Sequence, residues 1–109
     1  MAEELENIEY QAVIAIVNNG FANKVMDAAR EAGCRGGTII HARGTGHLKS
    51  EKTYGIVVTP DKELVLMVVN KELVDPILQA VDKVVGIQTD GHGIVFSLPV
   101  DHVAGLKIK

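Results

Sequence analysis

Residues 10–33 read YQAVIAIVNNGFANKVMDAAREAG and contain a strand pattern, a turn and a helix pattern in that order. The first eight residues form a nearly continuous apolar run of strand length, which is typical of a buried central strand. Asn18-Asn19-Gly20 then supplies turn and helix-cap chemistry. Apolar residues follow at i, i+4, i+7, i+8 and i+11, the stripe of an amphipathic helix, and they are Phe21, Val25, Ala28, Ala29 and Ala32. Gly33 is the expected C′ residue after this helix.

The middle of the chain predicts three further strands. Residues 38–43 (TIIHAR) are rich in β-branched side chains and lie between glycine pairs. Residues 54–59 (YGIVVT) also have strand composition, and Pro60-Asp61 is a turn signal before the apolar run 63–69 (ELVLMVV). The runs 10–17 and 64–69 are apolar on both faces, which predicts strands that are covered on both sides.

A second helix is expected after residue 70, because Leu73, Val74, Ile77, Leu78, Val81, Val84 and Val85 share one helical face. Its start has two interpretations: Asn70 caps a helix with distorted first turns, or Asp75 is the cap and Pro76 the first helical residue. Gly86 is expected to end the helix. A glycine-rich loop follows over 87–93, then a strand over 94–98 and a tail over 99–109 that pairs at a sheet edge.

The order of elements is therefore β-α-β-β-α-β with one extra strand-like piece, the pattern of the ferredoxin-like fold. We expect an α+β sandwich, with an antiparallel sheet and two helices on one face. The length of 109 residues predicts one domain over 1–109, in which residues 1–9 fray and the polar residues 47–55 form a flexible loop.

Composition excludes several classes of protein. The net charge is −3 and no basic stripe accumulates, which argues against nucleic-acid binding. Apolar runs reach about eight residues, far below the roughly 20 needed to span a membrane. The lone Cys34 and an acidic N-terminus without an apolar signal segment predict a cytoplasmic protein. An RNA-recognition motif shares the strand order, but it needs aromatic side chains on its central strands, and only Phe96 is expected in a strand core.

The sequence contains no convincing catalyst. No Ser-His-Asp or Cys-His arrangement stands out, and Asp90 and Asp101 have no evident partner for acid/base work. Metal ligands are also not predicted, because the spacing of Cys34 and the four histidines matches no metal motif; the histidines are His41, His47, His92 and His102.

Glycine clusters mark two candidate binding loops. Gly44, Gly46, Gly91 and Gly93 flank predicted strands, where a backbone without side chains can approach an anion. Turns would require the same glycines, and the sequence leaves both interpretations open. The loop that begins after residue 43 is locally basic, which fits either a phosphate, an acidic partner or an ordinary solvated loop; its basic residues are Arg43, His47, Lys49 and Lys52.

Three stretches together resemble the PII signal-transduction family: residues 29–46 (AREAGCRGGTIIHARGTG), 64–70 (LVLMVVN) and 91–100 (GHGIVFSLPV). The resemblance implies a homotrimer that is not an enzyme. Its members bind an adenine nucleotide (AMP, ADP or ATP) in clefts between subunits and signal through a loop, called the T-loop, to a partner such as a membrane transporter or an enzyme.

The resemblance also implies site residues. The expected nucleotide-binding residues are Thr38, Gly44, Thr45, Gly46, Lys62, Gly91, His92, Gly93 and Lys107. The expected partner-binding residues of the loop are His47, Lys49, Lys52 and Tyr54.

Three positions depart from the family pattern. Ile94 stands where the family's Gly-Asp-Gly-Lys element has lysine, Gly105 stands at an arginine position, and Leu48 replaces a glutamine that helps to hold Mg²⁺ and 2-oxoglutarate. We therefore expect weak dependence on the terminal phosphates and little response to 2-oxoglutarate. The leading alternative is a trimeric divalent-metal-tolerance protein of the same fold.

Overall fold

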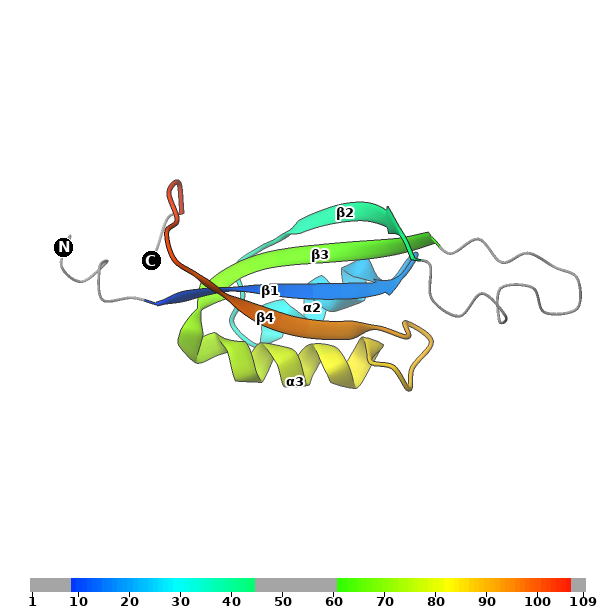
Figure 1. The fold of residues 1–109 in the computed structure, drawn as a ribbon. Helices are drawn as coiled ribbons and strands as arrows, with labels where there is room; N and C mark the ends of the chain where they lie inside the picture. Colours follow the sequence, from blue (N-terminus) through cyan, green and yellow to red (C-terminus); the bar gives the residue numbers. More distant parts are fainter. Residues whose placement is uncertain (1–8, 45–60, 107–109) are drawn as a thin grey trace, which may run out of the picture.

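The computed structural model describes residues 9–44 and 61–106. The expected strand over 54–59 and the flexible loop over 47–55 lie outside the described residues, as do residues 1–8 of the segment 1–9 that is expected to fray. Figure 1 shows the described elements, which are β1 (Tyr10–Asn18), α2 (Ala22–Glu31), β2 (Thr38–Arg43), β3 (Asp61–Asn70), the 3₁₀ helix η2 (Lys71–Leu73), α3 (Val74–Val85) and β4 (Ile94–Val100).

The four strands form one antiparallel sheet in the order β2-β3-β1-β4. The central strand β1 pairs with β3 on one side and with β4 on the other. Both helices lie on the same side of this sheet (Figure 1). The predicted α+β ferredoxin-like fold is confirmed.

The core lies between the sheet and the two helices. Alternate residues of β1 and β3 point into it and are buried, among them Val13, Val17, Val65 and Met67. They pack against the apolar stripes of both helices, including Val25, Ile77 and Val81. The period of 3.6 in both helices predicts this packing. The runs 10–17 and 64–69 are apolar on both faces, so the sequence does not show which alternate residues face the helices.

The other sheet face carries apolar side chains that no described element covers. Ile14 is paired with Leu66 and with Phe96 across three strands, and all three point away from the helices. Phe96 lies within β4, as expected, and it is 38% exposed on this open face.

Local signals explain most element ends. Gly33 has a φ of +111° after α2, which confirms its predicted role as the C′ residue. The Asn70 side chain accepts a hydrogen bond from the Glu72 N–H (3.2 Å), so the first interpretation of the second helix holds: Asn70 caps one 3₁₀ turn before α3 begins. Pro76 then lies in the first turn of α3, where a proline is tolerated.

Gly86 ends α3, although its backbone is extended rather than left-handed. A Cβ at this position would lie 2.4 Å from the Asp82 carbonyl oxygen, so close packing is what requires the glycine.

At the other end of the chain, the Glu9 carbonyl accepts a hydrogen bond from the Lys71 N–H (2.9 Å). No helix in residues 9–44 or 61–106 is long and apolar enough to cross a membrane.

Candidate ligand site at one end of the sheet

Four strand ends meet at one end of the sheet. The antiparallel register places Asn18 of β1 opposite Lys62 of β3, and Arg43 of β2 opposite Asp61. The start of β4 joins them, because Ile94 is paired with Ile16. In Figure 1 this end carries the loop between α3 and β4 and the last residues of β2. The topology therefore gathers Gly44, Lys62 and the loop 86–93, which are far apart in the sequence.

Lys62 supplies a cation at this end. Its Nζ donates a hydrogen bond to Asn18 Oδ1 at 2.6 Å, and the side chain is half-buried. Its aliphatic stem passes next to Gly44, where a Cβ would lie 3.0 Å from Lys62 Cε. An ammonium group has three donors, so this contact leaves Lys62 with capacity to bind an anion.

Asn18 joins Lys62 to the loop 86–93. Its side-chain Nδ2 donates to the Asp90 carbonyl at 3.0 Å, and its backbone N–H donates to the Gly91 carbonyl at 2.8 Å. The sequence predicts only turn and helix-cap chemistry for Asn18, so it misses the role of this residue in the network. No signal in the sequence could have shown it, because both side-chain partners are more than 40 residues away.

The amides of the loop bond mostly within the protein. The Gly91 N–H donates to Thr89 Oγ1 (3.2 Å), the His92 N–H to the Thr89 carbonyl (2.9 Å) and the Gly93 N–H to the Val85 carbonyl (2.7 Å). These three amides thus already have acceptors within the protein, whereas the glycine pattern predicts a backbone that approaches an anion. The His92 side chain is exposed, whereas Gly91 and Gly93 are buried.

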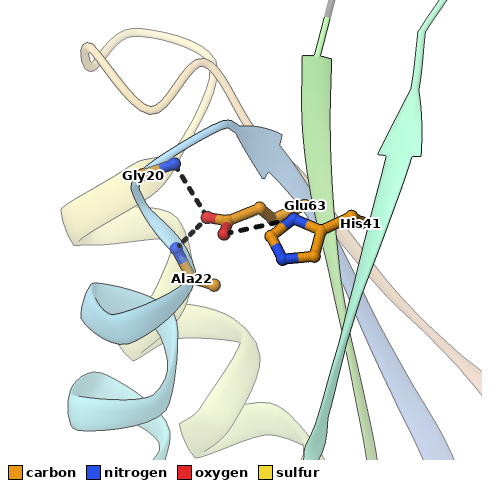
Figure 2. A network of polar contacts seen from close by, with 4 residues as sticks. All are labelled: Gly20, Ala22, His41 and Glu63. Carbon is orange, nitrogen blue, oxygen red and sulfur yellow. Dashed lines mark hydrogen bonds and ion pairs between the residues drawn. The ribbon is translucent and has the colours of Figure 1, made fainter.

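Glu63 forms a second polar network beside this end. Its Oε1 accepts hydrogen bonds from the Gly20 N–H (2.8 Å) and the Ala22 N–H (3.0 Å), so a carboxylate from β3 caps the N-terminus of α2. His41 lies on the neighbouring strand β2, and its Nδ1 is 3.9 Å from Glu63 Oε2 (Figure 2). His41 is exposed and lies opposite Glu63 in the register of β2 and β3, so it faces the helix side of the sheet.

The expected site residues fall into three groups. Gly44, Lys62, Gly91, His92 and Gly93 come together at the end of the sheet described above. Thr38 lies at the start of β2, so it is separated from Arg43 by the strand's length, about 16 Å at roughly 3.3 Å per residue. Thr45, Gly46, His47, Lys49, Lys52, Tyr54 and Lys107 lie outside the described residues.

Metal ligands do not cluster in the described part of the chain. Within residues 9–44 and 61–106, no three His, Cys, Asp or Glu side chains lie close enough together to hold a metal ion. The metal-tolerance alternative remains an untested prediction.

A comparison with protein-family models shows the family of the chain. The profile described as "Nitrogen regulatory protein P-II" matches residues 10–109, which is nearly the whole chain. The chain belongs to the PII family. No sequence among the curated proteins matches it significantly.

The PII fold is also found among solved structures. The crystal structure of Arabidopsis thaliana PII bound to citrate is similar, with a TM-score of 0.64 and 24% sequence identity. The match covers 88% of this chain and 79% of the Arabidopsis chain. At this identity the likeness shows the fold of this PII protein alone.

Proposed function

We propose that this PII protein is a cytoplasmic regulator that binds an adenine nucleotide between the subunits of a homotrimer. In this proposal it signals to a transporter or an enzyme through the loop that contains His47, Lys49, Lys52 and Tyr54. The observation that carries the proposal is that Gly44, Lys62 and the loop 86–93 lie at one end of the sheet. The Lys62 stem lies beside Gly44, and its ammonium group is linked to the loop through Asn18. Family membership supplies the regulatory role.

A site between subunits fits the position of Thr38. Thr38 and Gly44 lie at opposite ends of β2, so a single chain does not bring them close together. Two chains that pack side by side can combine the Thr38 end of one strand with the Lys62 end of another. The open apolar sheet face, which includes Phe96 and Leu98, supplies the surface for such packing.

Calorimetry with AMP, ADP and ATP tests nucleotide binding. Ile94 and Gly105 replace two basic residues of the family pattern, and each lost charge-assisted hydrogen bond to phosphate is worth about 1.5–3 kcal/mol. We therefore expect AMP and ADP to bind within about tenfold of ATP, since a tenfold change corresponds to about 1.4 kcal/mol. Added Mg²⁺ with 2-oxoglutarate should change the affinity little.

Two variants locate the site. Lys62→Met should weaken ADP binding by about tenfold or more, because it removes the ammonium donor. Lys83→Met removes the same charge from the exposed surface of α3 and should leave ADP binding unchanged. If ATP bound two orders of magnitude more tightly than AMP and 2-oxoglutarate tightened it further, the assignment of Ile94 and Leu48 to those family positions would be wrong.

A further inference from the structure

Asn18 contacts two parts of the candidate site with one side-chain amide. Its Oδ1 accepts from Lys62 Nζ at 2.6 Å, and its Nδ2 donates to the Asp90 carbonyl at 3.0 Å. Both partners fix the orientation of the amide, because an ammonium group can only donate and a carbonyl can only accept. Asparagine suits this position, since an aspartate would lack the donor and a leucine would lack both groups.

The Lys62 side chain extends this connection toward β2. Its stem lies against Gly44, the last described residue of the chain before residue 61, and a Cβ at residue 44 would lie 3.0 Å from Lys62 Cε. Lys62 is thus held between Gly44 on one side and Asn18 on the other. A change in the position of its ammonium group would alter contacts at both places.

We propose that Asn18 is a positioning residue that couples the loop 86–93 to Lys62, and through the stem of Lys62 to Gly44. The consequence for binding rests on the proposed function: an anionic oxygen of the ligand that binds Lys62 changes the hydrogen bond to Asn18, and Asn18 transmits the change to Asp90 and Gly91. The same contact keeps the ammonium group beside the loop before any ligand binds.

A double-mutant cycle without ligand tests the coupling itself. In the ¹⁵N-labelled protein, Lys62→Met should shift the backbone amide resonances of Gly91 and its neighbours in the loop. In an Asn18→Leu background the same substitution should leave these resonances nearly unchanged, because the connecting amide is gone. Asn19→Leu is the matched control, since Asn19 is the next residue along the chain and is exposed, and in that background the shifts should persist.

A second cycle measures the effect on binding with ADP and adenosine as probes. Asn18→Leu should weaken ADP binding by about tenfold and leave adenosine binding unchanged, because the ammonium group serves the phosphates. In the Lys62→Met background Asn18→Leu should cause no further loss. A residue that only stabilises the fold would lower both affinities and would act equally in either background.

Two milder variants test the coupling in case Asn18→Leu or Lys62→Met fails to fold. Asn18→Ser keeps a small polar group that is too short to reach both partners, and Gly44→Ala displaces the Lys62 stem while Asn18 stays intact. Both should reproduce the selective loss for ADP, with thermal melts that show a folded protein. Equal shifts of the loop resonances with and without Asn18 would overturn the coupling, even if ADP binds. If the shifts of the loop resonances depend on Asn18 but the protein binds no nucleotide, the coupling is supported and the proposed function is rejected.

Discussion

Glu63 is the only buried charged side chain within residues 9–44 and 61–106. It points to the helix side of β3, in line with Val65, Met67 and Val69, where the strand pattern otherwise places apolar residues. Two N–H groups at the start of α2 explain why this position tolerates a charged side chain, because both donate hydrogen bonds to one oxygen of the Glu63 carboxylate. A charged residue in the buried register of a strand is the signal that could have revealed this role in the sequence.

Removal of the Glu63 carboxylate should destabilise the protein. Glu63→Ala leaves two N–H groups of the α2 N-terminus without their acceptor, and we expect a loss of about 1–3 kcal/mol in the free energy of unfolding. Glu63→Gln keeps one acceptor oxygen and should cost less. Urea denaturation measures both. Glu31→Ala, at the exposed end of the same helix, is the control and should change stability little; an equal loss at both positions would contradict the capping role.

His92 has a φ of +48°, a left-handed conformation that side chains rarely adopt. His92→Gly should therefore keep or slightly raise the melting temperature, because glycine adopts this conformation without steric cost. His92→Val should destabilise by about 1–2 kcal/mol, the usual cost of a left-handed residue with a Cβ branch. His102→Val at another exposed histidine provides the comparison. Similar melting temperatures for the valine and glycine variants at residue 92 would contradict this backbone assignment.

The elements were predictable wherever one periodic pattern dominates. The apolar run of β1 and the stripes of both helices gave the correct type and nearly the correct ends. β3 begins two residues earlier than its apolar run, because Asp61 and Lys62 pair with Arg43 and Asn18 in the sheet. This extension depends on tertiary pairing, which strand propensity does not encode. β4 likewise continues through Pro99, which an edge strand tolerates.

The candidate site was predictable only in part, because it also depends on contacts between distant parts of the chain. Glycines and a lysine next to strand ends can be named from the sequence, and the fold brings Gly44, Lys62 and Gly91 to one end of the sheet. Asn18 could not be assigned, since its turn chemistry explains it without any partner. Its two contacts arise only when β1 lies between β3 and the loop after α3.

Gly93 joins three elements and should tolerate no side chain. A Cβ there would lie 2.6 Å from Val17 Cγ1 of β1 and 2.7 Å from the Val85 carbonyl oxygen of α3. Gly93→Ala must push these elements apart, and we expect a loss of about 1–3 kcal/mol, as for other overpacked sites. Gly36→Ala is the matched control, because nothing lies within 4 Å of a Cβ at that position. Thermal melts of the two variants check this, and equal stability would contradict the packing described for Gly93.

Within residues 9–44 and 61–106, one face of the sheet is covered by the helices and the other is open. The helices bury alternate residues of β1 and β3, while the opposite residues of the same strands remain partly exposed together with Ile94, Phe96 and Leu98 of β4. Soluble monomers rarely expose a continuous apolar surface of this kind. Packing of identical open faces around a threefold axis would cover all of them in one closed assembly.

Light scattering after size exclusion tests the trimer. The wild type should have three times the 11.7 kDa mass of the chain. Phe96→Lys places a charge on the open face, which costs little in a monomer at 38% exposure but much in a buried interface, so it should dissociate the assembly. Val84→Lys makes the same kind of change on α3 at a similar exposure of 40% and should leave the mass unchanged. A wild type that is monomeric at micromolar concentration would remove the basis for a nucleotide cleft between subunits, because Thr38 and Lys62 would then have no second chain to bring them together.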